Sequence, residues 1–331
     1  MWRTVRVRLP SGWPLRLLIS NIGEARLPPQ DLSTDCDVVV VNYNVGELLS
    51  LCVASALREG ADHVIVVDNA SHDASLSMLE RDFPSEPRLR VIRNQENFGF
   101  AKACNIGAQT SSARNILFLN PDSTLEAGAL ARLIAVLRSD GSIGMVGALL
   151  CNPDGSEQAG GRRVFPTPGR AFIRAFGLSR LAKIFPNVFS DFLLHEEPLP
   201  TVPSPIEAIS GACMLVKREA LDAVGLWDDE YFLHCEDLDW CMRFHQAGWK
   251  IFFVPDAKVF HVLGASSRSR PIFVEWHKHH GMLRFYRKFF RRKYPAGLWA
   301  LVVCGVWFRF GCVAGYYTLR RVLRFFGVKR G

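Results

Sequence analysis

Four short apolar runs in the first third of this chain constrain its fold more than any other feature. They are Val38–Val41, Val64–Val67, Leu89–Ile92 and Ile116–Leu119. Each run is rich in Val, Ile or Leu and does not alternate with polar residues, which is typical of a strand buried on both faces of a sheet. We therefore expect four interior strands of an α/β protein.

Helical patterns occupy the spaces between and after these runs. Glu47–Leu57 places its apolar residues on one helix face, and Leu125–Leu137 does the same. Strands and helices that alternate at this rhythm predict a mostly parallel, doubly wound sheet with helices on both faces.

Polar residues follow all four runs. Asn42 ends the first, Asp68 ends the second, Asn94 follows the third, and Asn120 and Asp122 follow the fourth. Because ligands of open α/β sheets bind at the carboxyl ends of the strands, these residues predict a polar site at that edge. The alternative is that Asn and Asp are there only because they make good turns.

The remaining chain divides by composition. Residues 1–34 contain several prolines and predict a peripheral lead-in, whereas 35–267 predict one globular domain with halves 35–150 and 151–267. Residues 152–206 hold eight of the eighteen prolines, which indicates a loop-rich insertion. We expect short helices there near Arg170–Phe176 and Leu181–Phe185, then helices at Arg218–Val224 and Glu236–Ala247 and a strand at Ile251–Val254.

Composition excludes several classes of protein. The chain has 331 residues, of which 49% are hydrophobic and 22% are charged, as in packed globular proteins. The nine cysteines are odd in number and include no C-x-x-C pair, which favours a reducing, cytoplasmic setting over a disulfide framework. No G-x-G-x-x-G follows the first strand, which argues against a nicotinamide-dependent oxidoreductase.

Several ordered motifs carry a family resemblance. They are Val39-Val40-Val41-Asn42-Tyr43-Asn44, Val67-Asp68-Asn69, Asn97-Phe98-Gly99, Asn120-Pro121-Asp122 and Cys235-Glu236-Asp237-Leu238-Asp239. This set, over about residues 35–265, resembles the family 2 glycosyltransferases, in particular their rhamnosyltransferase-like members.

The resemblance implies a GT-A fold and an inverting transfer from a nucleotide sugar, assisted by Mg²⁺ or Mn²⁺. It implies rhamnose from a dTDP- or UDP-sugar donor as the leading donor assignment and a glycan or lipid-linked glycan as the acceptor, as in the synthesis of cell-envelope polysaccharides.

The resemblance also implies which residues bind the nucleotide sugar. The aspartate that matches Asp68 accepts a hydrogen bond from the pyrimidine imide, which a carboxylate suits. Its alternative role is to cap a helix over Ser71–Leu79. The other expected donor-binding residues are Asn42, Tyr43, Asn44, Asn69, Asn97, Gly99, Lys102, Asn105, Asn120, Asp122 and Gly211. Gly99 and the helix that follows it would approach the diphosphate, whereas Lys102 fits a surface lysine equally well.

The expected metal site departs from the D-x-D pattern of many GT-A enzymes because Asn120 stands at the first acidic position. Asp122 remains, and the histidine that matches His261 joins the metal in some relatives. Hard divalent cations take oxygen ligands, which the donor phosphates also supply. Asp122 and His261 are therefore the expected metal ligands, with a purely structural His261 as the alternative.

The chemistry requires a general base, and Asp237 is the first candidate. It lies with Glu236 and Asp239 in the first turn of a predicted helix, where the helix dipole favours ionised carboxylates. Glu236 is the second candidate, and a merely solvated acidic helix start is the alternative. Asp239 and Trp240 are expected on the acceptor side.

The C-terminal tail is basic and apolar. Residues 268–331 carry fifteen Lys or Arg and one acid, Glu275. Aromatic residues alternate with basic ones between Leu283 and Phe290, which is typical of an interfacial amphipathic helix, and His277, His279 and His280 are expected to be exposed.

Leu298–Leu319 is apolar except for Arg309. It is long enough to span a bilayer, but a central Arg costs about 2.5–3.5 kcal/mol and both flanks are basic. We expect a helix or hairpin lying in the inner, cytoplasmic leaflet of the membrane, with an anionic membrane surface bound through 276–331, in preference to a transmembrane segment near 298–319. Nucleic-acid binding through the aromatic and basic residues is the alternative, and we do not expect it.

Overall fold

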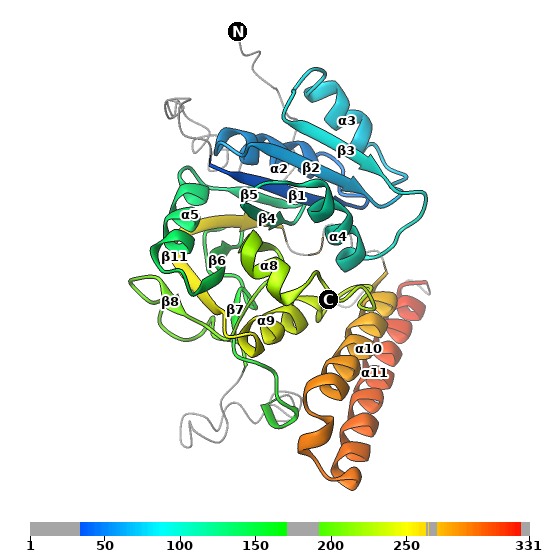
Figure 1. Cartoon of the computed structure of the whole chain (residues 1–331). Helices are drawn as coiled ribbons and strands as arrows, with labels where there is room; N and C mark the ends of the chain where they lie inside the picture. Colours follow the sequence, from blue (N-terminus) through cyan, green and yellow to red (C-terminus); the bar gives the residue numbers. More distant parts are fainter. Residues whose placement is uncertain (1–33, 171–191, 263, 265–269, 326–331) are drawn as a thin grey trace.

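A single mixed sheet organises the protein, which the computed structural model describes for residues 34–170, 192–262, 264 and 270–325 (Figure 1). Its first half consists of β3 (Leu89–Arg93), β2 (His63–Asp68), β1 (Cys36–Asn42) and β4 (Asn115–Leu119), in that order and all parallel. These are the four predicted strands. β3 lies at the edge of the sheet and its side chains are partly exposed, so the prediction that it is buried on both faces is wrong.

The second half of the sheet is mixed. β10 (Cys213–Lys217) runs antiparallel between β4 and β6 (Ile143–Cys151), and β11 (Lys250–His261) is parallel to β6. The short strands β5 (Ser123–Leu125) and β8 (Ser204–Pro205) pair with β11, and β7 (Arg162–Arg163) pairs with β9 (Ala208–Ile209) in a separate small sheet. The predicted halves 35–150 and 151–267 therefore share one sheet.

β11 is longer than the predicted strand Ile251–Val254. Its register against β6 shifts between Val254 and Lys258, around Pro255, and the strand then continues to His261. A bulge accommodates a proline within a strand. Because the proline interrupts the apolar pattern, the sequence predicted only the first part of the strand. His261 is the last residue of this strand.

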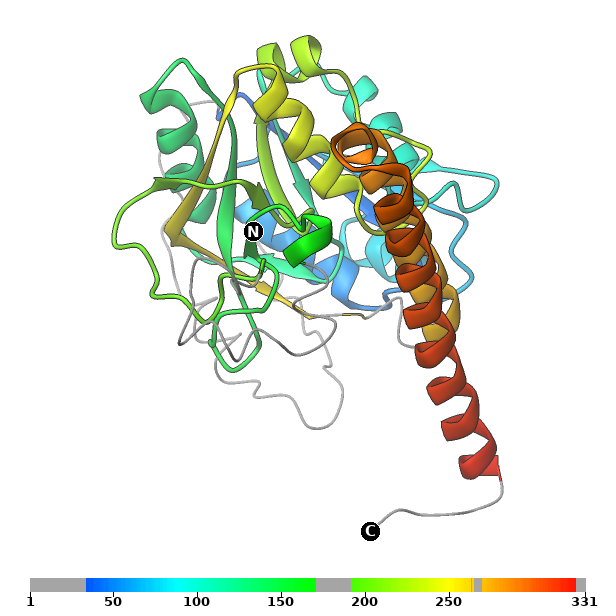
Figure 2. The same cartoon turned by 90° about the horizontal axis from the view of Figure 1, so that it is seen from below.

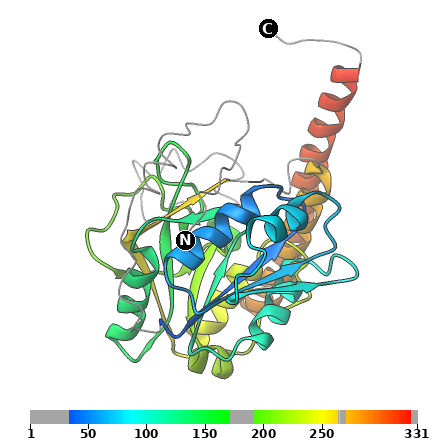
Figure 3. The same ribbon diagram turned by 90° about the horizontal axis from the view of Figure 1, so that it is seen from above.

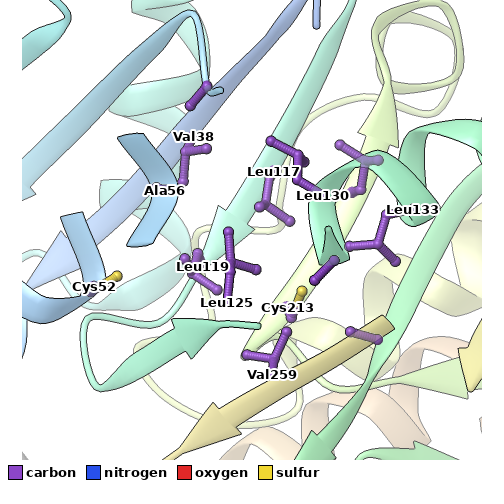
Figure 4. Close-up of a cluster of buried hydrophobic side chains, with 14 of the residues drawn as sticks. Val38, Cys52, Ala56, Leu117, Leu119, Leu125, Leu130, Leu133, Cys213 and Val259 are labelled. Atoms are coloured by element: carbon purple, nitrogen blue, oxygen red, sulfur yellow. The ribbon is translucent and has the colours of Figure 1, made fainter. Parts of the chain in front are cut away.

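Helices cover both faces of the sheet, as predicted (Figures 1 and 3). α2 (Leu48–Arg58), α3 (Ser75–Asp82) and α5 (Ala129–Ser139) pack on the face that includes Val38 and Val40. α4 (Phe100–Thr110), α8 (Arg218–Val224) and α9 (Glu236–Gln246) pack on the face that includes Val39 and Val41. Figure 4 shows the first core, where side chains of α2 and α5 meet those of β1, β4 and β10.

The tail forms an antiparallel helical hairpin. α10 (Pro271–Phe289) leads through the 3-10 turn η2 (Arg291–Lys293) into α11 (Ala296–Phe325). Phe285 and Tyr286 of α10 are buried in the second core, so the prediction that this segment is an interfacial amphipathic helix is wrong: its aromatic residues pack on the globular domain. Figure 2 shows α11 extending away from that domain. Ala296–Leu323 is long and apolar enough to cross a membrane and is not buried.

Arg309, the charged residue within this apolar helix, is held by α10. Its Nη1 atom lies 2.7 Å from His279 Nε2 and 3.7 Å from Glu275 Oε2. His279 is 4% exposed, so its predicted exposure is wrong. The single acid of the tail thus compensates the single charge of the apolar segment.

Two predictions fall on residues outside the described part of the chain. They are the lead-in at 1–34, of which only residue 34 is described, and the short helices Arg170–Phe176 and Leu181–Phe185, which lie almost wholly within 171–191.

Candidate active site

Asn42 and Asp68 lie side by side where β1 and β2 end. Asn42 Nδ2 donates to Asp68 Oδ1 at 2.7 Å, and both side chains are buried. Within the described residues, Asn42 Oδ1 is buried and has no hydrogen-bond partner. The Asp68 carboxylate also has more acceptor sites than the two it uses here. Because an unpaired buried acceptor is costly, this pair is suited to receive N–H donors of a ligand.

Asp68 does not cap the next helix. Its Oδ2 accepts the N–H of Ser71 at 3.0 Å, which shapes a turn, whereas α3 begins only at Ser75. There Asp73 accepts the Ser75 N–H at 3.1 Å. The N-cap residue of α3 is Ala74, so the alternative role of Asp68 as a helix cap is wrong.

Two asparagines expected at the donor instead hold loops together. Asn44, with φ 54°, accepts the N–H groups of His72 and Asp73 at 2.8 and 3.2 Å. The Asn105 side chain both donates to Trp227 O at 2.9 Å and accepts from Trp227 N at 3.0 Å. Its amide is fully engaged by the main chain, which corrects the expectation that Asn105 binds the nucleotide sugar.

The turn before α4 is fixed by its own chain. Asn69 Nδ2 donates to Gly99 O at 3.0 Å, and Asn97 Oδ1 accepts the Gly99 N–H at 2.9 Å. Gly99 has φ +83°, and a Cβ there would lie 2.6 Å from Phe232 O. Phe100 N donates to the same carbonyl at 2.9 Å. The close approach predicted for Gly99 is thus made to Phe232, and the first N–H of α4 is already used.

The two remaining residues near the donor strands lie closer to the surface. Lys102 is exposed, with its Nζ 4.3 Å from the centre of the Phe98 ring. Tyr43 is partly buried beside Asn42. Lys102 therefore has the surface position that was its alternative.

Asp122 and His261 meet at the edge of the sheet, although 139 positions separate them in the sequence. Asp122 Oδ1 lies 3.2 Å from His261 Nε2, and the two side chains are 8% and 7% exposed. β5 pairs with β11 in a register that sets Ser123 opposite His261, which brings the two together. Asn120 Nδ2 lies 3.3 Å from the same Nε2.

Gln158 sets the orientation of the His261 ring. Its Nε2 donates to the main-chain carbonyl oxygen of His261 and to Asn152 Oδ1, both at 3.1 Å. Its Oε1 therefore faces His261 Nδ1, at 2.6 Å. Oε1 can only accept, which places a proton on Nδ1; in the neutral ring, Nε2 then carries the lone pair that a metal would take, directed at Asp122. Two electron-rich atoms at 3.2 Å suit a shared cation.

This donor set fits a divalent metal that the substrate helps to bind. In the described part of the chain, no three His, Cys, Asp or Glu residues cluster as metal ligands. Asp122 and His261 therefore supply two positions, which leaves the others of an octahedron to phosphate oxygens and water. The predicted pair is brought together by the fold.

The Asp237 carboxylate accepts three hydrogen bonds. Its Oδ2 accepts from Arg163 Nη2 at 2.5 Å and from Gly211 N at 3.1 Å, while Oδ1 accepts from Leu238 N at 2.8 Å. Burial opposes ionisation of Asp237, but the Arg163 charge and these hydrogen bonds outweigh it and lower its pKa. Asp237 is therefore ionised at neutral pH.

Glu236 has the opposite behaviour. It is 7% exposed, and its Oε2 is buried without a hydrogen-bond partner among the described residues. Burial, followed by the neighbouring charge of Asp237, raises the pKa of Glu236 to about 8. Adjacent carboxyls with separated pKa values are typical of acid–base sites.

Asp239 and Trp240 face away from the site. Asp239 is wholly buried, paired with Arg243 and Lys288 at 2.7 Å each. Trp240 is also wholly buried and donates to Gly225 O at 2.9 Å. Neither side chain is accessible to a substrate, which corrects the expectation that both lie on the acceptor side.

Main-chain contacts join the metal-ligand pair to the acids of α9. Asn120 N donates to Ala212 O at 3.0 Å, and the preceding residue, Gly211, donates its N–H to Asp237. A Cβ on Gly211 would lie 3.5 Å from Asp237 Cβ. Gly211 and Asp237 are thus in direct contact through the main chain.

The same turn connects to the donor side. A Cβ on Gly211 would lie 3.7 Å from the Phe100 ring. Phe100 follows Gly99 in the chain, and the Gly99 carbonyl accepts a hydrogen bond from Asn69, which is the neighbour of Asp68. Contacts of neighbouring residues therefore link the turns that carry Asp68, Asp122 and Asp237, and their convergence on one donor stays a prediction.

Two residues of this site were not predicted. Gln158 and Arg163 both belong to the proline-rich segment 152–206, where neither has a strand or helix pattern around it. Their partners, His261 and Asp237, are 103 and 74 positions away. A polar residue that acts only through such distant contacts leaves no local signal in one sequence.

The fold and site together define a GT-A glycosyltransferase. Two solved structures share the fold. One is GalNAc-T7 with UDP, GalNAc and Mn²⁺, with a TM-score of 0.55 and 20% identity over 76% of this chain and 47% of that chain. The other is a mannosyltransferase from Pyrobaculum calidifontis with GDP-Man and Mn²⁺, with a TM-score of 0.51 and 17% identity over 82% and 69%.

The chain belongs to glycosyl transferase family 2, whose sequence model matches residues 37–225. A second model, glycosyltransferase like family 2, matches residues 204–278.

Two curated relatives are rhamnosyltransferases. The chain is 28% identical to the N-acetylglucosaminyl-diphospho-decaprenol L-rhamnosyltransferase of Mycobacterium tuberculosis, over 68% of this chain and 75% of the relative. It is 25% identical to a dTDP-rhamnosyl transferase of Shigella flexneri, over 71% and 72%.

Proposed function

We propose that this enzyme is an inverting, divalent-metal-assisted rhamnosyltransferase. It would move rhamnose from a dTDP- or UDP-linked donor to a hydroxyl of a glycan or lipid-linked glycan acceptor, in the synthesis of a cell-envelope polysaccharide. The names of the relatives support the sugar and the kind of acceptor.

The structural observation that carries the proposal is the Asp122–His261 pair. His261 Nε2 faces an Asp122 carboxylate oxygen at 3.2 Å, and Gly211, beside the turn at Asn120, bonds an acid of α9. Neither a nucleic-acid-binding scaffold nor a plain turn requires this arrangement. Asp122 and His261 would hold Mg²⁺ or Mn²⁺, which when bound would neutralise the charge of the departing diphosphate.

The chain's own groups divide the remaining work. Asn42 and Asp68 would accept hydrogen bonds from the donor base. Asp237, kept ionised by Arg163, would take the proton of the acceptor hydroxyl, and attack on the face opposite the diphosphate inverts the sugar carbon. Glu236 is the alternative base, because its raised pKa matches a proton acceptor that works above neutral pH.

A donor panel tests the proposal. The full chain would be incubated with dTDP-, UDP- and GDP-sugars, Mn²⁺ or Mg²⁺ and an N-acetylglucosaminyl diphosphate linked to a short isoprenoid. We expect dTDP to be released from dTDP-rhamnose, and we expect chelation of the metal by EDTA to abolish this release. The NMR coupling at the anomeric carbon of the product should show inversion. Equal rates with and without EDTA would contradict the role of the Asp122–His261 pair.

The location of the enzyme is part of the proposal. The apolar α11 and its basic flanks support a position on the cytoplasmic face of a membrane, where a lipid-linked acceptor is found. The acceptor would then reach the site from the side on which the hairpin meets the domain.

A further inference from the structure

A pocket lies between the loop that precedes α9 and the tail hairpin. It has a volume of about 170 Å³, and its lining includes Tyr231, Phe232 and His234 of the loop and Trp276, His277 and His280 of α10. The Phe232 and His277 rings stack with centroids 4.5 Å apart and planes at 27°. Trp276 is 45% exposed, so an aromatic surface remains open to a ligand.

The floor of this pocket is the segment that carries the acids. His234 and Cys235, with φ of 69° and 74°, directly precede Glu236. α10 packs tightly on them, because a Cβ on Gly281 would lie 2.7 Å from His234 O. The pocket wall at His234 and the proposed base Asp237 therefore belong to one short stretch of chain, 234–237.

The charges of the pocket select against a phosphate. Burial lowers the pKa of His234 to about 4 and also lowers the pKa of His277, so both imidazoles are neutral at pH 7. Glu230 at the rim is 71% exposed and adds a negative charge, although Arg284 lies 3.8 Å from it. Neutral rings with a few hydrogen-bonding groups at the rim suit an uncharged polar ligand.

We infer that this pocket is the subsite for the acceptor's sugar ring, an inference that rests on the proposed transferase function. The apolar C–H face of a pyranose would pack on Trp276 and the Phe232–His277 stack, while its hydroxyls bond Glu230 and His280 at the rim. The pocket is also the junction of domain and hairpin, so a lipid-linked acceptor would enter it directly from the membrane side.

Two substitutions test the subsite. Trp276→Ala and His280→Ala remove pocket walls whose side chains are exposed. We expect each to raise the KM for the N-acetylglucosaminyl acceptor at least tenfold. The KM for the donor and the thermal shift produced by dTDP should stay within twofold of wild type, because the donor side is untouched.

Trp307→Ala is the matched control. Trp307 packs on Trp276 with ring centroids 5.0 Å apart but does not line the pocket. The substitution therefore loosens the same contact between α10 and α11 and leaves the residues that line the pocket in place. Its acceptor KM should match wild type. An unchanged acceptor KM in Trp276→Ala and His280→Ala, or an equal rise in Trp307→Ala, overturns the inference.

A binding measurement separates the subsite from the transferase function. Saturation-transfer NMR with octyl N-acetylglucosaminide should show ring protons in contact with the wild-type protein, and the effect should disappear in Trp276→Ala. A wild-type protein without this signal refutes the subsite even if transfer is measured. Conversely, a signal without transfer from any donor supports the subsite while the proposed function fails.

Discussion

At the scale of residues, the site depends on partners that hold the reactive groups in place. Gln158 fixes the proton of His261 on Nδ1, and Arg163 keeps Asp237 ionised. The motifs in the sequence identified His261 and Asp237 but not these partners, because single residues in a loop-rich segment leave no periodic pattern. The sequence thus pointed to His261 and Asp237, whose roles stay predictions, but not to the residues that orient them.

Gln158→Leu should weaken metal binding. Without the amide oxygen, nothing fixes the Nε2 lone pair of His261 toward Asp122. Loss of such an outer-shell partner typically costs about 10–100-fold in affinity. We expect the Mn²⁺ concentration for half-maximal activity to rise by that factor. Gln246→Leu, at an exposed position of α9, serves as the control and should leave the Mn²⁺ titration unchanged.

Asp237→Asn should reduce turnover by about 10²–10⁴-fold, the usual contribution of a general base. The amide cannot accept the acceptor proton, although it can still bond the main chain. The dTDP-induced thermal shift verifies that the variant is folded and binds nucleotide. Glu236→Gln is the paired variant. If it loses the activity while Asp237→Asn retains near-normal turnover, the base is Glu236.

The stability of the enzyme should report the buried Glu236. A carboxyl whose pKa is raised on folding, here from 4.5 to about 8, contributes stability that is full at low pH and is lost as pH rises through that window. Glu236→Gln removes this dependence. The melting temperature of the variant relative to wild type should therefore be higher at pH 9 than at pH 5. Glu219→Gln, which removes an exposed carboxyl of α8, should show no such trend.

At the scale of elements, apolar periodicity predicted the strands and helices well. α8 has the predicted bounds, α2 differs from prediction by one residue at each end, and α9 ends one residue early. The misses have physical causes. β11 is longer than predicted because a bulge at Pro255 interrupts its apolar pattern. β3 is an edge strand although its composition is typical of an interior strand. α5 begins four residues later than predicted because Ser123–Leu125 form β5. Tertiary pairing, which single-sequence patterns do not contain, decided each of them.

Gly99→Ala should be strongly destabilising, since it combines an unfavourable φ with a clash against Phe232 O. Gly248 has the same φ of +83°, but nothing lies within 4 Å of its Cβ position. Gly248→Ala therefore measures the cost of φ alone, about 1–2 kcal/mol. Urea unfolding should show a clearly larger loss for Gly99→Ala. Equal losses in the free energy of unfolding would mean that the turn before α4 rearranges to relieve the clash with Phe232.

At the scale of the whole molecule, the tail combines two roles that composition alone could not separate. Its first helix belongs to the core of the domain, and its second helix is exposed. Basic residues interleaved with aromatic ones predicted a surface-binding segment, but three of those four aromatic side chains, Phe285, Tyr286 and Phe290, are buried by the fold. The surface available for a membrane is therefore chiefly that of α11.

Vesicle binding tests that surface. The full chain should co-sediment with vesicles that contain anionic phosphatidylglycerol and bind less at high salt, because screening weakens attraction between exposed charges. Changing Arg320 and Arg321, both exposed on α11, to Gln should reduce binding several-fold. Changing Arg81 and Arg90, exposed on the domain, should not. Salt-sensitive binding to DNA or RNA with no vesicle binding would instead favour a nucleic-acid partner.

The ion pair between Arg309 and Glu275 has a geometric consequence. By tying one side of α11 to α10, it determines which side chains of α11 point outward, Leu301 and Phe308 among them. α10 is itself built into the domain that carries the acids. This partly exposed ion pair thus helps to set the angle at which the acids of the domain would face a bilayer.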